Sequence, residues 1–229
     1  MIHLNNLRFQ YDGPEAFSLR LKDFQVAAGT SVFLDGPSGS GKSTVLNLMA
    51  GLTSPDQGTV TLLGTNIHQL TAPMCDQFRA DHMGIIFQSF NLVPYLSVIE
   101  NIMLPCVFSK KRQAHAVKTF GTLLCAARQW FQDIGIDSAR YTAPVTQLSV
   151  GQQQRVAIAR ALIGAPELIM ADEPTSALDS LNKDQFMTLL FNETQKVGAT
   201  LLFVSHDTTL KAWFKRHVAM TDLLGKGTE

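Results

Sequence analysis

Eight consecutive residues have the types and spacing needed to hold a phosphate chain. Residues 36–43 read Gly-Pro-Ser-Gly-Ser-Gly-Lys-Ser and fit the pattern G-x-x-x-x-G-K-S/T. Glycine lets successive backbone N–H groups point at the β- and γ-phosphates. Lys42 would reach the β/γ oxygens, and the hydroxyl of Ser43 would bind Mg²⁺. The nucleotide-binding positions expected here are Gly36, Pro37, Ser38, Gly39, Ser40, Gly41, Lys42, Ser43 and Thr44.

The flanking sequence favours this interpretation. Residues 30–35 (TSVFLD) form a short apolar run of strand length, and residues 44–50 (TVLNLMA) have helical spacing. A strand, a loop and a helix in this order are the setting that the phosphate motif requires. The positive end of the helix would then face the anion. A chance match in a chain of this length is on the order of 1%, given the average frequency of glycine.

A second chemical signal is the run Leu168-Ile169-Met170-Ala171-Asp172-Glu173. An apolar strand that ends in two acids places both carboxylates at the carboxyl edge of a sheet, where open α/β folds bind ligands. Asp172 would hold Mg²⁺, directly or through water. Glu173 would orient and deprotonate the water that attacks the γ-phosphorus. Alone, the pair would indicate only a strand end, but the upstream phosphate loop favours the catalytic interpretation.

Composition limits the remaining function classes. The chain has 229 residues, is 45% hydrophobic and carries 19 basic and 19 acidic residues, so we expect one ordered domain and no nucleic-acid partner. No apolar run approaches the roughly 20 residues of a membrane span, and the N-terminus lacks a signal pattern, which favours cytoplasmic residence. Cys75, Cys106 and Cys125 are odd in number and widely spaced, which supports neither a disulfide framework nor a CxxC metal site.

The order of apolar patterns predicts an α/β protein. Alternation in residues 2–9, 17–26 and 58–63 predicts three early strands, of which the first two pair antiparallel. Continuous apolar runs at residues 84–87, 168–171 and 200–204 predict parallel strands that are buried on both faces. The stretch from about residue 89 to 165 is largely helical. Within it, residues 110–112 (Lys-Lys-Arg) are interpreted as the solvated start of a helix, not as a binding patch.

A third motif carries a resemblance to a known family. Residues 148–152 (Leu-Ser-Val-Gly-Gln), followed by the helical run 153–162, resemble the signature of the ATP-binding subunits of ABC transporters. The resemblance extends from Tyr11 to His206, with the motifs in the family's order. It implies a P-loop NTPase core with a parallel sheet, an N-terminal antiparallel β subdomain and an inserted helical subdomain. We therefore expect a single ABC ATPase domain, with residues 1–88 and 166–229 as nucleotide-binding core and 89–165 as helical subdomain.

The resemblance also implies roles for individual residues and a homodimer that closes around two ATP molecules. In the family, the signature contacts the γ-phosphate of the ATP held by the opposite subunit. A catalytic glutamine after a core strand senses Mg²⁺ or the attacking water, and a switch histidine contacts the γ-phosphate. An aromatic residue stacks on adenine, and the D-loop, here residues 176–179, crosses to the other subunit. The matching residues are Ser149, Gly151 and Gln152 of the signature, Gln88, His206, Tyr11 and Asp179.

Val150 departs from the family pattern, which has glycine at this position. A β-branched residue cannot adopt the backbone conformation if φ is positive there. Two interpretations stay open. Either the position tolerates valine because Ser149 and Gly151 are kept, or the site is weakened or asymmetric.

Residues 87–102, with Leu104 and Pro105, resemble the lipoprotein-release and macrolide-efflux group of these ATPases, and also their cell-division relative. The resemblance implies an integral membrane permease as partner and a peripheral location on the cytoplasmic face of the inner membrane. The function would be export, lipoprotein extraction or mechanotransmission. Two interpretations are open for a set of apolar residues in this segment: they form a socket for a partner helix, or they pack the helical subdomain. The set is Phe90, Leu92, Val93, Tyr95 and Leu96. The alternatives are a soluble regulatory or nucleic-acid-associated ATPase, and a cell-division signalling ATPase.

Overall fold

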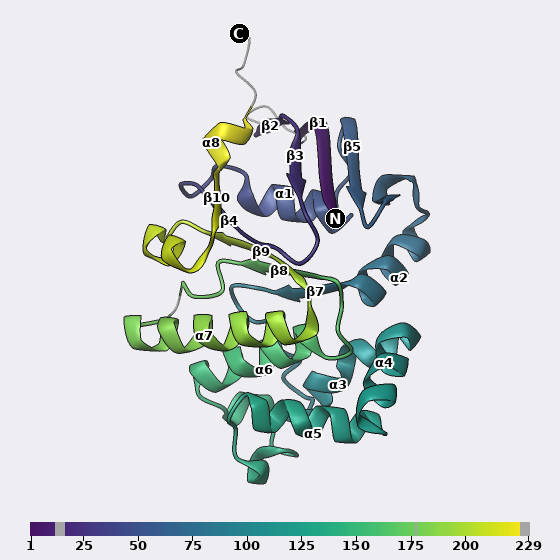
Figure 1. Ribbon diagram of the computed structural model, residues 1–229, viewed down its shortest axis with the longest axis vertical. Coiled ribbons are helices and arrows are strands. Elements are labelled where there is room, and N and C mark those ends of the chain that lie inside the picture. The colour runs from purple at the N-terminus through teal and green to yellow at the C-terminus, as the bar shows by residue number, and fades with distance from the viewer. Residues whose placement is uncertain (12–16, 177, 225–229) are drawn as a thin grey trace. The chain divides into compact units, whose positions relative to one another are not determined.

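The computed structural model describes residues 1–11, 17–176 and 178–224, and the chain divides into two compact units (Figure 1). The first unit contains residues 1–76 and the chain from residue 202 onward, and the second contains residues 77–201. Within the described residues, none of the helices has the length and apolar character that crossing a bilayer requires.

The first unit opens with an antiparallel sheet in the order β2, β1, β5, β6, with β3 also paired to β1. Burial alternates along β1, β2 and β3, so one face of these strands packs on the core. The predicted strand 17–26 is two strands, because the backbone N–H of Lys22 donates to the carbonyl of Leu223 (2.8 Å) between them. The bounds are β1 Ile2–Gln10, β2 Ser18–Leu21, β3 Phe24–Val26, β5 Gln57–Leu62 and β6 Thr65–Asn66.

The strand, loop and helix predicted around the phosphate motif also lie in the first unit. β4 (Ser31–Asp35) leads into the loop, and α1 (Lys42–Met49) follows it. β4 pairs in parallel with β10 (Arg216–Ala219), which is followed by α8 (Met220–Leu223). Behind β4, the rings of Phe33, Phe203 and Phe214 pack with centroids 5.2 to 6.0 Å apart. This apolar packing fixes the strand end from which the loop departs.

The second unit combines parallel strands with helices. β7 (Met83–Ile86) and β8 (Leu168–Asp172) pair in parallel, as their continuous apolar sequences predict. The helices are α3 Val98–Phe108, α4 Lys110–Phe120, α5 Leu123–Asp133, α6 Val150–Leu162 and α7 Ser180–Val197. Two elements cross the unit boundary along the chain, namely α2 (Ala72–His82) and β9 (Thr200–Ser205).

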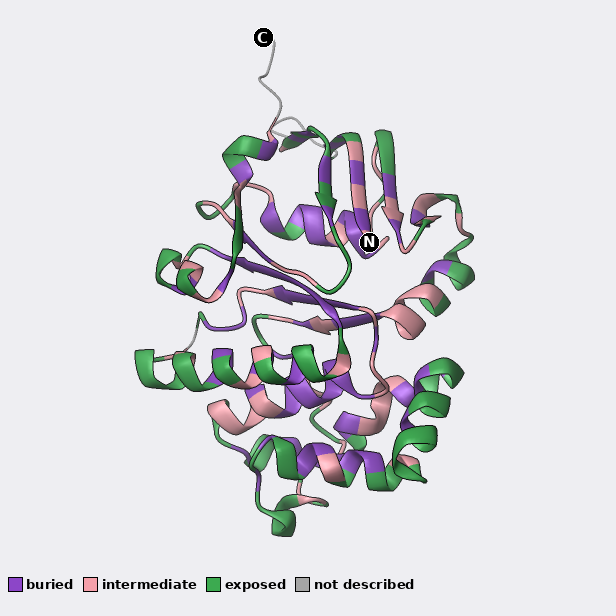
Figure 2. Ribbon diagram, viewed as in Figure 1, coloured by how far each residue is buried: buried purple, intermediate pink, exposed green. Residues whose placement is uncertain are grey.

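Helix α6 is the central helix of the second unit. It contacts α3, α5, α7 and β7, and it is buried along most of its length, whereas α4 and α7 expose one face (Figure 2). Its C-terminal turn approaches β7 closely at Gly84. A Cβ on Gly84 would lie 2.2 Å from the carbonyl oxygen of Ala161, so only glycine permits this contact.

The interpretation of residues 110–112 as a solvated helix start is wrong for Arg112. Its side chain is buried, and it donates to the carbonyls of Met83 (3.1 Å), Ala161 (2.8 Å) and Ile163 (2.8 Å from Nε). The last two carbonyls belong to the C-terminal end of α6, where backbone acceptors have no intrahelical donor and a cation is favoured. Burial lowers the pKa of the Arg112 guanidinium to about 10.

Candidate nucleotide-binding and catalytic site

The phosphate loop has a backbone that only glycine adopts easily. Gly39 has φ +79° and Gly41 has φ +93°. At Gly41 a Cβ would also lie 2.7 Å from Cζ at the tip of the Phe17 ring, so the conformation favours glycine and an added Cβ would displace that ring. The buried ammonium of Lys42 curls back into the loop, where it donates to the carbonyls of Gly36 (2.7 Å) and Pro37 (3.0 Å). These hydrogen bonds tie the Lys42 side chain to the loop backbone.

The start of α1 fits an anion. Its N-cap is Gly41, no side chain caps its first turn, and no acidic residue lies there. The backbone N–H groups of a helix start and its dipole favour negative charge. Among the described residues, the buried hydroxyl of Ser40 in the same loop is one of the few polar side-chain atoms without a hydrogen-bond partner. An unpaired buried hydroxyl beside an uncapped helix start fits a phosphate oxygen.

The acidic pair ends β8 as predicted, and its second member has a strained backbone. Both carboxylates are half-buried, and Glu173 has φ +47°, a left-handed conformation that costs free energy for a residue other than glycine. The next carbonyl, that of Pro174, accepts a hydrogen bond from the amide of Gln154 (3.0 Å). Gln154 is a buried residue of α6, so this helix restrains the segment that carries Glu173.

The loop after β7 is strained in the same way. Gln88 is exposed, and the nearby Phe90 and Asn91 have φ +60° and +47°. Arg160 of α6 donates to both of their carbonyls, at 2.5 Å to Phe90 and 2.7 Å to Asn91. Burial lowers the pKa of the Arg160 guanidinium to about 10.

The signature forms the N-terminus of α6. Ser149 is its exposed N-cap, and its hydroxyl accepts from the backbone N–H of Gln152 (3.3 Å). In return, the side chain of Gln152 accepts from the backbone N–H of Ser149 (3.0 Å), which completes a capping box. Val150 is the first helical residue and does not have a positive φ, so the conformational objection to valine does not apply.

Three comparisons with known proteins bear on this site. A family model described as ABC transporter matches residues 19–176. The lipoprotein-releasing system ATP-binding protein LolD of Shewanella denitrificans is 39% identical over 86% of this chain and 81% of its own length. The chain belongs to the ABC transporter family. It is an ABC-type ATPase of the group that contains LolD and MacB, as its motifs indicate.

Two further relatives define the group and the fold of this ABC ATPase. The macrolide export ATP-binding/permease protein MacB of Salmonella paratyphi A is 36% identical over 97% of this chain, which spans only 33% of MacB. A dimeric post-hydrolysis structure of the ATP-binding cassette MJ0796, bound to ADP and Pi, is 35% identical and superposes with a TM-score of 0.84. The superposition covers 98% of this chain and 94% of the MJ0796 chain. The predicted fold class is thereby confirmed.

The other expected site residues of the ABC ATPase lie at the ends of elements. Tyr11 follows β1 with its ring 42% exposed and edge-on to Phe9 (centroids 4.7 Å apart). His206 is exposed directly after β9. Asp179 caps the N-terminus of α7 by accepting from the backbone N–H of Asn182 (2.9 Å). Of the expected D-loop, Ala177 lies outside the described residues.

Each unit thus holds a part of the expected set. The first contains Tyr11, residues 36–44 and His206, and the second contains Gln88, residues 149–152, Asp172, Glu173 and Asp179. Sequence reasoning missed Arg160 and Gln154, which hold the strained loops of the second unit. Their acceptors are main-chain carbonyls, which have no sequence signal.

The socket predicted for a partner helix is partly wrong. Phe90, which has a left-handed backbone, is only 8% exposed, whereas Tyr95 is 86% exposed. Two exposed apolar residues that were not expected, Val107 (70%) and Phe108 (65%), lie at the end of α3. The exposed apolar side chains of this part of the unit are therefore Tyr95, Val107 and Phe108.

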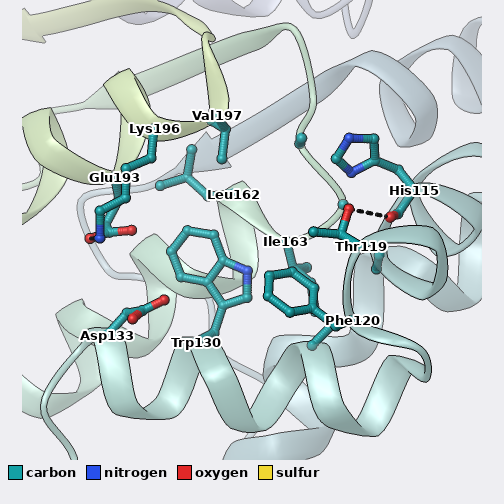
Figure 3. A pocket seen from close by; sticks show the side chains of 14 residues that line it. His115, Thr119, Phe120, Trp130, Asp133, Leu162, Ile163, Glu193, Lys196 and Val197 are labelled. Carbon is teal, nitrogen blue, oxygen red and sulfur yellow. Dashed lines mark hydrogen bonds and ion pairs between the residues drawn. The ribbon is translucent and has the colours of Figure 1, made fainter.

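A pocket of about 280 Å³ lies elsewhere in the second unit, among α4, α5 and α7 (Figure 3). Trp130 and Phe120 form its apolar wall, and the ion pair of Glu193 and Lys196 (2.6 Å) lies at one end. None of the motif residues lines this pocket. It is separate from the expected nucleotide chemistry.

Proposed function

We propose that this ABC ATPase dimerises around two ATP molecules and drives a separate membrane permease. The observation that carries the proposal is that the chain has two helix starts with residue types suited to phosphate. One is the uncapped start of α1 behind the glycine loop, and the other is the start of α6 at Ser149. In a head-to-tail dimer, α1 would bind the phosphates of one ATP and α6 would contact the same ATP from the partner subunit. The dimeric MJ0796 cassette bound to ADP and Pi supports this arrangement.

Within each site the chain's own residues would have distinct tasks. Lys42 and the loop amides would hold the β- and γ-phosphates, and Tyr11 would stack on adenine. Glu173 would take the proton of the attacking water, which Gln88 and His206 would help to place. Ser43, Asp172 and Gln88 offer the oxygen ligands that Mg²⁺ prefers. When bound, Mg²⁺ would neutralise charge on the β- and γ-phosphate oxygens.

The membrane partner is inferred from the relatives. LolD is named for lipoprotein release and MacB for macrolide export, and MacB is described as an ATP-binding and permease protein in one chain. We propose that the exposed residues Tyr95, Val107 and Phe108 receive a cytoplasmic helix of the permease, which would hold the ATPase at the membrane surface. The proposed subdomain division is residues 1–88 and 166–229 as nucleotide-binding core, with 89–165 as helical subdomain.

The experiment is ATP turnover by the purified chain, alone and with the membrane protein that copurifies with it. Lys42→Ala is expected to lose turnover by at least about 100-fold and to lose nucleotide binding by calorimetry, because the loop ammonium is removed. Turnover that rises with the membrane protein would support a coupled transporter. Unchanged nucleotide affinity in Lys42→Ala would contradict the proposal that this loop binds the nucleotide phosphates.

Two other results would favour different functions. Turnover that is indifferent to any membrane protein would favour a soluble regulatory ATPase, and stimulation by nucleic acid would favour a nucleic-acid-associated one. A division-complex partner in place of an exporter would favour the signalling ATPase.

A further inference from the structure

Helix α6 carries two buried polar side chains that both hold main-chain carbonyls of other segments. Gln154 donates to the carbonyl of Pro174, and Arg160 donates to those of Phe90 and Asn91. The segments they hold follow β8 and β7, and each contains residues with positive φ. The helix that begins with the signature therefore also restrains the two segments that carry Glu173 and Gln88.

Arg160 is in an unusual environment for an arginine. It is 9% exposed, and within the described part of the chain its guanidinium makes no ion pair with a carboxylate. A buried charge without a counter-ion is costly unless hydrogen bonds replace its hydration. The planar guanidinium has the fork geometry needed to reach two adjacent carbonyl oxygens. We therefore attribute the burial of Arg160 to its hydrogen bonds with the carbonyls of Phe90 and Asn91.

The two carbonyls that Arg160 holds belong to residues with an unfavourable backbone conformation. Two successive residues other than glycine are left-handed, and for the bulky Phe90 this conformation is a clear outlier. Such a conformation persists only where its surroundings determine it. A second anchor lies further along the loop, where buried Asn101 accepts from the backbone N–H of Val93 (2.8 Å) and donates to the carbonyl of Leu96 (3.2 Å). The loop from residue 88 to 97 is thus fixed at both ends by buried side chains.

We propose that Arg160 is a positioning residue for ATP hydrolysis, which holds the carbonyls of Phe90 and Asn91 and so fixes where Gln88 lies. The same loop carries Tyr95, one of the three exposed apolar residues that form the surface proposed to receive the permease helix. Force on that surface would reach Gln88 through a loop that Arg160 keeps in one conformation. Because Ser149 caps the start of α6, one helix of 13 residues connects the signature to this loop. The inference rests on the proposed function, since it assigns Gln88 to the reaction.

The test uses the purified full-length chain with Arg160→Lys, whose single ammonium cannot reproduce the planar fork. Turnover is measured against MgATP concentration. Hydrogen exchange of the amides in residues 88–97 is measured without nucleotide. We expect kcat to fall about 10- to 100-fold from misplacement of the catalytic group, with little change in KM. We also expect faster exchange that is confined to residues 88–97. Arg160→Gln, with one amide donor group, repeats the test if the lysine variant does not fold.

Arg155→Lys is the matched control on the same helix. Arg155 donates to the carbonyl of Ile134 (3.4 Å) and to the side chain of Gln185 (3.0 Å), and the loop is not among its partners. This variant should keep wild-type kcat and exchange. Wild-type kcat in Arg160→Lys, or an equal loss in Arg155→Lys, would overturn the assignment. So would an exchange increase that is spread over the whole chain.

Failure of the proposed function would look different. If the wild-type chain shows no turnover with MgATP, or if Lys42→Ala turns over at the wild-type rate, the proposed chemistry is wrong. The exchange measurement without nucleotide would still decide whether Arg160 holds the loop.

Discussion

The phosphate loop of the first unit and the loops that carry Gln88 and Glu173 in the second unit reach unusual backbone conformations by opposite means. The phosphate loop uses Gly39 and Gly41, whose positive φ values cost little because glycine has no Cβ. The loops after β7 and β8 place Phe90, Asn91 and Glu173 in the left-handed region and restrain the chain there with hydrogen bonds from α6. One conformation is intrinsic to its residues, whereas the other depends on the rest of the unit.

This difference indicates where the protein can respond to a partner. A glycine loop keeps its shape as long as its own residues are present. A strained loop stores free energy, on the order of 1 to 3 kcal/mol for each residue, and can change when its restraint changes. The exposed residue Tyr95 lies on the strained loop. We therefore expect nucleotide binding to be robust and hydrolysis to be sensitive to the partner.

Within the phosphate loop, the largest effect on stability is expected at Gly41. Gly41→Ala should lower the free energy of unfolding by about 2 to 4 kcal/mol, because it adds left-handed strain and contacts with Phe17 and Leu19. Gly39→Ala is the matched control. Nothing lies within 4 Å of its added Cβ, so only the strain of about 1 kcal/mol is expected. Urea unfolding measures both, and equal losses would contradict the role given to the space at Gly41.

Ala165→Gly tests whether the removal of left-handed strain stabilises the protein. Ala165 has φ +50° and belongs to the second unit, but it lies outside the proposed site. Glycine should raise the free energy of unfolding by about 0.5 to 1 kcal/mol, since relief of left-handed strain exceeds the added entropy of the unfolded chain. A clear loss of stability in urea unfolding would mean that this left-handed residue is not strained.

Val150→Gly measures whether the signature needs glycine for its conformation. Val150 begins a regular helix and is 50% exposed. Glycine should therefore lower the free energy of unfolding by about 0.5 kcal/mol and leave turnover within about 2-fold of wild type. A rise in turnover of 10-fold or more would instead support the interpretation that valine weakens the site.

The smallest effect is expected from an ion pair of the second unit. Partial burial would raise the pKa of the Glu167 carboxyl, but hydrogen bonds from Lys111 (2.5 Å) and His82 (3.1 Å) outweigh it and lower the pKa. Its stabilisation is therefore present above the ordinary carboxyl pKa and is lost as pH falls through the lowered value.

Glu167→Gln should remove at most about 0.5 kcal/mol at pH 7, as for other half-exposed pairs. The difference from wild type should disappear in acid. Urea unfolding at pH 7 and pH 4 checks this, and a difference that grows toward pH 4 would contradict the assigned sign.

The sequence predicted those parts of the molecule in which residue type alone determines structure. The glycine loop, the strand before it and the acids after Leu168–Ala171 are of this kind, since glycine, apolar runs and paired carboxylates have local signatures. The prediction for Arg112 was wrong because its acceptors are carbonyls that lie near it only after α4 and α6 pack together. Arg160 went unnoticed for the same reason.

Phe90 shows a further limit of sequence reasoning. Its apolar ring looked suitable for a surface socket, but the ring is buried and the backbone of this residue is left-handed. Nothing in the residue types of this loop indicates positive φ at a phenylalanine. The carbonyl of Phe90 is held by Arg160, which lies 70 residues away in the sequence.

The central claim is that two copies of this chain close around ATP, with the loop of one and the signature of the other at each site. Its most direct test is the molar mass of Glu173→Gln in MgATP, measured by light scattering during size-exclusion chromatography. This variant keeps the phosphate loop and the signature but loses the proposed catalytic base, so we predict a stable dimer with MgATP and a monomer without it. The double variant Glu173→Gln with Lys42→Ala should stay monomeric. A monomer of Glu173→Gln at saturating MgATP would contradict the claim.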